Sequence, residues 1–77
     1  MYDNVTLAEK CVVVRRALGL SQRKFGSLFG ASQSSIALIE RGYVAIHNVV
    51  ISSVIGLSFI VLQRFGVEEL KNVWNYM

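Results

Sequence analysis

The sequence contains no proline, one cysteine and one histidine among 77 residues. A single cysteine excludes an internal disulfide, and one cysteine with one histidine cannot build a Cys/His zinc cage. We therefore expect no metal and no cofactor. The lack of proline and the presence of only six glycines disfavour a sandwich or barrel of many strands. Helices joined by short turns are the better expectation.

The chain is too short for two domains, so we expect residues 1–77 to form one. Hydrophobic residues make up 53% of it, a little above the globular average. A domain of this size buries only roughly 60–65% of its unfolded surface, so it needs a rich core or a partner. The amino end lacks the pattern of a secretory signal. We expect a cytoplasmic location.

One apolar run, from Val49 to Leu62, must be tested as a membrane span. It covers 14 residues and is interrupted by Ser52, Ser53 and Ser58. A helix that crosses the bilayer needs about 20 apolar positions. We therefore predict a helix that is buried or faces a partner, with no membrane span. A small membrane-associated regulator is the weakest of the alternatives.

Positive charge is concentrated in the front of the chain. Residues 1–42 carry Lys10, Arg15, Arg16, Arg23, Lys24 and Arg41 against Asp3, Glu9 and Glu40. The remaining residues carry two basic and two acidic side chains. Any attraction for a polyanion therefore belongs to the front half. A solvated basic face would give the same pattern, so charge alone does not decide the function.

Residues 1–42 carry the signals of three helices. Thr6 and Glu9 form a capping box, which predicts a helix from Leu7 to Leu18 that ends before Gly19. Ser21 and Ser32 are good N-caps, and they predict helices over Gln22–Phe29 and Gln33–Arg41. The residues expected to face inward are Leu7, Cys11, Val14, Leu18, Phe25, Leu28, Phe29, Ile36 and Ile39.

The back half is harder to assign because its apolar run is almost continuous. We expect a loop over Tyr43–His47, a long helix capped by Asn48 that Gly56 to Ser58 can break in two, and a final helix over Val67–Trp74. A β-hairpin over Val49–Val61 is the alternative, because a continuous apolar run gives no clear period. Residues 48–77 would form a packing or dimerisation segment.

The stretch from Gln22 to Arg41 has the spacing of a helix-turn-helix motif. Small Gly26 would let the second helix approach the first, and Gly30 would supply the left-handed conformation of the turn. Ile36 and Ile39 would anchor the underside of the second helix. Its outer face would then be free to enter a DNA major groove.

Three segments between Arg15 and Gly42 carry a resemblance to a known family. They are Arg15-Arg-Ala-Leu-Gly-Leu-Ser-Gln22, Gly30-Ala-Ser-Gln-Ser-Ser-Ile36 and Ile39-Glu-Arg-Gly42. The sequence resembles the phage repressor and Cro class, also called the lambda-repressor-like or XRE family. The resemblance implies an all-α domain of five helices, or an α+β Cro-like domain with a carboxyl-terminal hairpin. It also implies a homodimeric transcription regulator that binds specific double-stranded DNA.

The resemblance further implies roles for individual residues. Gln33, Ser34 and Leu38 would face DNA bases, and Leu38 would sense only thymine methyl groups or shape. The residues that would contact phosphates are Gln22, Arg16, Arg23, Lys24, Ser35, Arg41 and Tyr43. Arg15 and Glu40 would form a structural ion pair between the first and third helices.

Enzyme activity finds little support in the sequence. His47 has no second ligand or carboxylate at a useful spacing, Ser34 has no neighbouring base, and Cys11 lies on an apolar stripe. Trp74 and Tyr76 are expected to anchor the last helix or to contact a second copy. The main rival function is an antitoxin or another protein-interaction module of the same fold, whose apolar carboxyl half would cover a protein partner.

Overall fold

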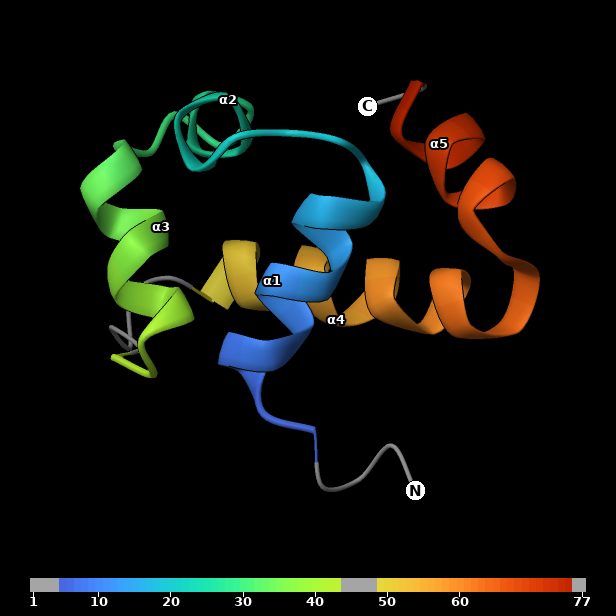
Figure 1. The fold of residues 1–77 in the computed structure, drawn as a ribbon, viewed down its shortest axis with the longest axis horizontal. Helices are drawn as coiled ribbons and strands as arrows, with labels where there is room; N and C mark the ends of the chain where they lie inside the picture. Colours follow the sequence, from blue (N-terminus) through green and yellow to red (C-terminus); the bar gives the residue numbers. More distant parts are fainter. Residues whose placement is uncertain (1–4, 44–48, 76–77) are drawn as a thin grey trace.

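The computed structural model describes residues 5–43 and 49–75, and within these ranges it contains five helices and no strand (Figure 1). The helices are α1 (Leu7–Ala17), α2 (Gln22–Ser27), α3 (Gln33–Glu40), α4 (Val49–Phe65) and α5 (Val67–Asn75). The expected all-α class is therefore confirmed. The loop, cap and anchor predictions for residues 44–48 and for Tyr76 lie outside the described residues.

The first three helices each begin at a side-chain cap. The hydroxyl groups of Thr6, Ser21 and Ser32 accept hydrogen bonds from the backbone N–H groups of Glu9, Lys24 and Ser35, at 3.2, 3.1 and 3.1 Å. Each cap satisfies a donor that has no partner inside its helix and contributes about 1 kcal/mol. The three starts therefore lie where the sequence predicts them.

Two glycines shape the corner between α2 and α3. A Cβ atom on Gly26 would lie 2.8 Å from the carbonyl oxygen of Ala31 and 3.2 Å from a side-chain carbon of Ile36. Gly30 has a φ of 68°, in the left-handed region that glycine adopts without strain. The tight approach and the turn therefore follow from these two positions, as the sequence predicts.

The side chain of Leu28 does not lie in the core, so the prediction for this residue is wrong. The sequence predicts it to face inward, but its side chain is 58% exposed. The reason is that α2 ends at Ser27, two residues earlier than expected. The N–H of Leu28 bonds to the carbonyl of Phe25, three residues back, which tightens the turn, and the side chain lines a pocket instead of joining the core.

The long back helix corrects two further predictions. Residues 49–65 form one continuous helix, so the hairpin over Val49–Val61 and the break at Gly56 to Ser58 are both wrong. Ile51, Ile55 and Phe59 recur every four residues, and all three are buried. Burial of this face outweighs the cost of a mid-helix glycine, about 0.5–1 kcal/mol.

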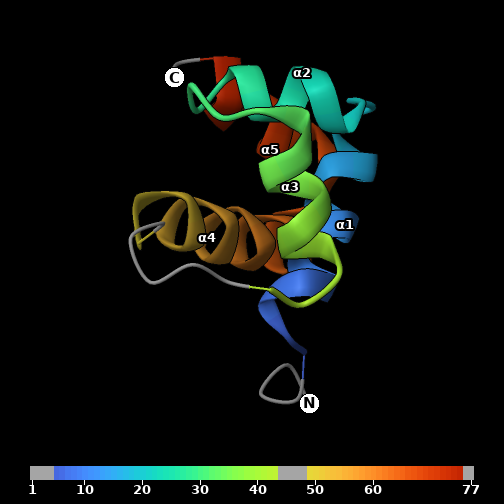
Figure 2. The ribbon, with the colours of Figure 1, turned by 90° about the vertical axis from the view of Figure 1, so that its left-hand side faces the viewer.

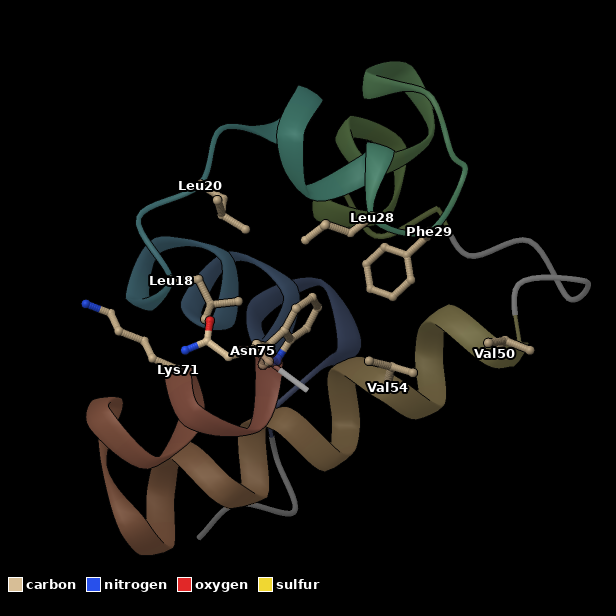
Figure 3. Close-up of a pocket in the computed structure, with 9 residues that line it drawn as sticks. Leu18, Leu20, Leu28, Phe29, Val50, Val54, Lys71 and Asn75 are labelled. Atoms are coloured by element: carbon tan, nitrogen blue, oxygen red, sulfur yellow. The ribbon is translucent and has the colours of Figure 1, made fainter. Parts of the chain in front are cut away.

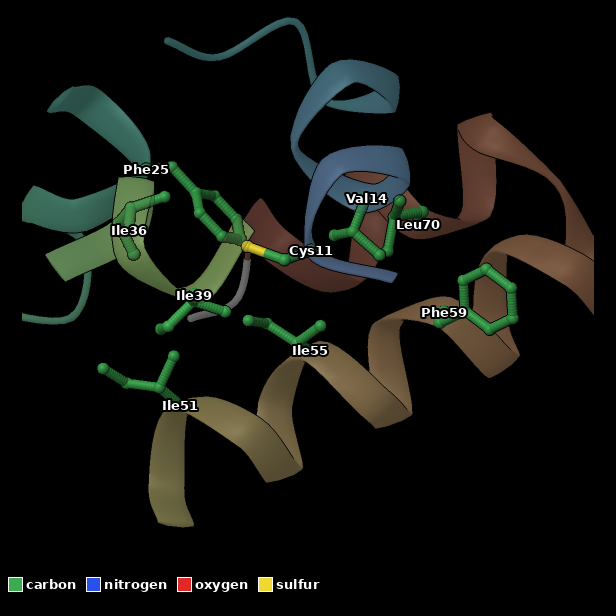
Figure 4. Packing of buried hydrophobic residues seen from close by; sticks show 9 residues of the cluster. All are labelled: Cys11, Val14, Phe25, Ile36, Ile39, Ile51, Ile55, Phe59 and Leu70. Carbon is green, nitrogen blue, oxygen red and sulfur yellow. The ribbon is translucent and has the colours of Figure 1, made fainter. Parts of the chain in front are cut away.

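The core joins the front and back of the chain (Figure 4). Its buried members are Cys11, Val14, Phe25, Ile36, Ile39, Ile51, Ile55, Phe59 and Leu70, which come from all five helices. Helix α1 packs against both α3 and α4, and Cys11 and Val14 on its apolar stripe are fully buried. The α2–α3 corner is thereby fixed to the rest of the fold.

The last helix packs against the corner through its tryptophan. The ring of Trp74 lies 5.6 Å from that of Phe25 and 5.9 Å from that of Phe29, measured between centroids. Its Nε1 donates a hydrogen bond to the hydroxyl of Ser58 at 3.0 Å, which satisfies the buried polar group of α4. Trp74 therefore contacts α2 and α4 together.

Among the helices of residues 5–43 and 49–75, none combines the length and the apolarity that a bilayer crossing requires. The longest, α4, has 17 residues.

Candidate nucleic-acid interface

Helix α3 lies at one edge of the molecule and faces the viewer in Figure 2. Ile36 and Ile39 are fully buried on its inner side. Gln33, Ser34 and Leu38 are exposed on its outer side. One face of the helix is thus anchored in the core while the other, which holds all three predicted base-contacting residues, is free.

A chain of hydrogen bonds runs from the core side of this helix to its exposed start. The amide nitrogen of Gln33 donates to the side-chain oxygen of Gln22 at 3.2 Å, and the amide nitrogen of Gln22 donates to Glu40 at 3.0 Å. Arg15 binds the same carboxylate through Nε at 2.7 Å and a second nitrogen at 3.2 Å. The first residues of α2 and α3 are therefore held side by side.

Arg15 and Glu40 are the two charged groups of this network, and they form an ion pair. The side chains are 14% and 8% exposed, and Arg15 also donates to the backbone carbonyl of Leu20 at 3.0 Å. Burial acts to raise the pKa of Glu40, but the hydrogen bonds from Arg15 and Gln22 outweigh it and hold that pKa below its usual value. The same bond raises the pKa of Arg15. Both groups are therefore charged over the whole neutral range.

Cys11 lies beneath the ion pair, with its sulfur 3.7 Å from a carboxylate oxygen of Glu40. Burial, followed by the negative charge of Glu40, raises the pKa of this thiol to about 12. Because the thiolate is the reactive form of cysteine, a thiol in this environment is inert. Its place in the core agrees with the expected structural role.

The candidate phosphate contacts occupy three places. Arg23 and Lys24 are exposed in the first turn of α2, next to the start of α3. Arg41 and Tyr43 are exposed at the opposite end of α3, and Arg16 is exposed in the last turn of α1. Glu40 is the one acidic residue from Ser21 to Tyr43, and Arg15 neutralises it. The exposed corner therefore carries positive charge without a competing carboxylate.

Two of the candidate phosphate contacts are already engaged within the protein. The hydroxyl of Ser35 is half-buried and shares a hydrogen bond with that of Ser32 at 3.1 Å. Gln22 uses its oxygen and one of its two amide hydrogens on Gln33 and Glu40. It retains one amide hydrogen for an outside acceptor. Within the described chain these two residues therefore organise the corner.

Ala37 borders the exposed side of α3, although the sequence alone does not single it out as a candidate contact residue. It lies one turn after Gln33 and directly before Leu38, and it is half-buried. The spacing from Ser34 to Leu38 was the available signal, because positions three and four apart share a helix face. An alanine methyl group can contact the methyl group of thymine.

A pocket of about 680 Å³ separates the α2–α3 corner from the back helices (Figure 3). Its described lining consists of Leu18, Leu20, Leu28, Phe29, Val50, Val54, Lys71, Trp74 and Asn75. In Figure 3 the amino group of Lys71 points away from the cavity. None of these residues is an acid, a histidine or a cysteine, so the described lining offers no acid–base or nucleophilic pair.

No three ligating side chains come together in a way that would hold a metal ion in the part of the chain that the structure describes. Comparison with known proteins gives no further constraint, since no family model, no curated protein and no solved structure matches this chain.

Proposed function

We propose that this protein is a transcription regulator of the phage repressor and Cro class, which binds specific double-stranded DNA as a homodimer. Helix α3 would lie in the major groove, which is wide enough to admit one helix. The observation that carries the proposal is the amide of Gln33. It is exposed at the start of α3, while Gln22 and the buried ion pair fix its position.

The chemistry of this amide favours adenine. Gln33 donates one amide hydrogen to Gln22, so its second amide hydrogen and its oxygen remain available. Adenine offers an acceptor at N7 and a donor at N6 in the major groove, and a glutamine amide pairs with both. Because Gln22 holds the amide plane, little side-chain entropy is lost when this pair forms. We therefore expect an adenine opposite Gln33 in each half-site.

The other exposed groups of the corner complete the proposed contact. Ser34 would donate to or accept from a base edge, while Ala37 and Leu38 would contact thymine methyl groups. Arg23 and Lys24 would bind the backbone at one end of α3, and Arg41 and Tyr43 at the other. One copy presents few base-reading groups, so specificity requires two half-sites about one helical turn apart.

The proposal involves no catalytic step and no cofactor, and it places the protein with DNA in the cytoplasm. Its specificity would come from side chains of α3, and a large share of its binding energy from phosphate contacts.

Selection of bound sequences from random duplexes tests the proposal and supplies the operator. Gln33→Ala should then weaken binding to that operator by about 5–150-fold, equivalent to about 1–3 kcal/mol, and relax the preference at one base pair per half-site. Gln63→Ala is the matched control, because it removes an exposed amide from α4. If selection yields no consensus, or Gln33→Ala behaves like Gln63→Ala, the proposal is wrong.

An antitoxin or other protein-interaction module is the second candidate, favoured by one observation. Helix α4 exposes Val49, Val50, Leu57 and Ile60 to solvent, and such a surface is typical of a protein interface. Under this alternative an unrelated protein would copurify in a fixed ratio and would protect these residues. A purified protein that self-associates and binds DNA without that partner would exclude it.

A further inference from the structure

Helix α4 exposes four large apolar side chains on one side. We define the outer α4 face as Val49, Val50, Ser53, Leu57, Ile60 and Arg64, which lie on one side of the helix. The side chains of Val49, Val50, Leu57 and Ile60 are 63%, 73%, 65% and 50% exposed. In Figure 2, the amino-terminal part of α4 projects beyond α3 on one side of the molecule. A helix that is apolar all round needs cover on both sides.

We propose that a second copy of this chain covers the outer α4 face, with the two α4 helices packed antiparallel about a two-fold axis. The proposal deepens the proposed function, because it rests on that function's need for two half-site readers related by a two-fold axis. Independent support for the interface comes from the charge pattern of this face and from the sizes of its side chains.

The charge pattern favours a copy of the same chain in the antiparallel direction. From Val49 to Gln63 the helix carries no charged side chain, and Arg64 lies at its end. In an antiparallel pair the two Arg64 side chains lie at opposite ends of the contact. In a parallel pair they would lie side by side, and the like charges would repel.

The sizes of the side chains on the outer α4 face determine the register of the two α4 helices. A two-fold contact centred near residue 55 places Val50 opposite Ile60 of the second copy, so that the large apolar groups meet. It also places Ser53 opposite Leu57, a small side chain against a large one. Gly56 lies beside this contact, and a Cβ atom there would meet nothing within 4 Å. The monomer therefore has no packing need for glycine at 56, whereas a closely approaching helix does.

The size of the face predicts a weak dimer. Four large apolar side chains per copy give an interface below the roughly 1,200–2,000 Å² that stable complexes bury. We therefore expect dissociation in the micromolar range without DNA, and tighter pairing when two half-sites hold both copies close together.

Sedimentation equilibrium without DNA tests the proposal directly. The unchanged protein should shift from monomer to dimer over about 1–500 μM. Leu57→Glu should remain monomeric over that range, because it buries a charge opposite Ser53. Val73→Glu is the matched control, an exposed valine of α5 outside the face, and it should dimerise normally. A monomer at every concentration, or a dimer that Leu57→Glu leaves intact, overturns the proposal.

Disulfide trapping tests the register even where Leu57→Glu disturbs folding. A mixture of Ser53→Cys and Leu57→Cys chains should give a mixed disulfide dimer faster than either chain alone. Native Cys11 is buried and does not compete. Trapping of Ser53→Cys with itself at the higher rate indicates parallel helices and overturns the proposal.

Other occupants of the face give distinct results. If the unchanged protein stays monomeric and binds phosphatidylglycerol vesicles in a way that Leu57→Glu abolishes, the occupant is a membrane surface and the proposal is wrong. Because no DNA is present in these experiments, a dimer that forms through α4 but selects no operator would overturn the proposed function and leave this interface standing.

Discussion

The front half of the molecule, α1 to α3, and the back half, α4 and α5, are held in different ways. The front half is fixed by polar bonds of defined direction, which run from Arg15 through Glu40 and Gln22 to Gln33. In the described part of the back half, Trp74 donates a hydrogen bond to Ser58, and the helices pack mainly through apolar groups. Hydrogen bonds of defined direction fix the position of the Gln33 amide, whereas apolar packing fixes only which face of a helix is buried. This difference supports the two proposals, in which Gln33 contacts DNA and α4 contacts a second copy.

The largest expected effect comes from comparing the same change, isoleucine to alanine, on the two faces of α4. Ile55 is fully buried and Ile60 is half-exposed on the same helix. Ile55→Ala should lower the free energy of unfolding by about 2–5 kcal/mol, because it leaves a cavity in the core. Ile60→Ala should change it by no more than about 0.5 kcal/mol at concentrations where the protein is monomeric. Urea unfolding followed by circular dichroism measures both, and equal losses would show that both faces are covered within one chain.

The next effect compares two glycines, one in each half. Gly26→Ala should destabilise the fold by about 1–3 kcal/mol, because the new methyl group meets the backbone oxygen of Ala31. Gly56→Ala should stabilise the monomer by about 0.5–1 kcal/mol, because nothing lies near it. Thermal unfolding at low protein concentration measures the two shifts. The same alanine should, however, weaken the dimer, and a sedimentation experiment that shows no weakening would count against close packing at residue 56.

Acid titration probes the polar network of the front half. The pKa of Glu40 is lower in the folded chain than in the unfolded one, so its contribution to stability is present above about pH 4.3 and is lost as the pH falls through the folded pKa. Glu40→Gln should therefore cost about 1–3 kcal/mol at pH 7 and progressively less below pH 4. Glu68→Gln, which removes an exposed carboxyl group of α5, is the control for the loss of one negative charge, and at pH 7 it should change the free energy of unfolding by no more than about 0.5 kcal/mol.

The smallest effect compares one cation from each half. Arg23→Gln should lower the slope of log affinity against log salt by about 0.9 for each copy on the operator, because one phosphate contact is lost. Lys71→Gln, an exposed cation of α5, should leave the slope unchanged. Equal reductions in the two variants would mean that the charge acts at long range and that α2 has no special place on DNA.

The motif of the front half could be predicted because its signals are local. A cap depends on residues three apart, and a left-handed turn depends on one glycine, so Ser21, Ser32 and Gly30 were sufficient to place the corner. The link between Gln22 and Gln33 could not be predicted from spacing. It joins residues 11 apart, and their contact depends on the angle at which two helices meet.

The packing of the back half could not be predicted in the same way, because its sequence does not separate a polar face from an apolar one. Apolar residues lie on several sides of α4, so the neighbouring helix decides which face is buried. Ile51, Ile55 and Phe59 face inward because α1 lies on that side, while Leu57 and Ile60 have the same character and remain outside. Leu28 shows the same limit just after α2, where its side chain lines a pocket instead of joining the core.

Trp74 has a spectroscopic consequence. It is the one tryptophan of the chain, and its ring lies against Phe25 of α2 and against Phe29 in the turn after it, while its indole nitrogen binds Ser58 of α4. Its fluorescence emission therefore reports how the two halves are joined, independently of the helical content of either. If α5 separates from α2 before the helices unfold, the emission will shift to longer wavelength at a lower denaturant concentration than the loss of helical ellipticity. Coincident transitions would mean that the two halves unfold as one cooperative unit.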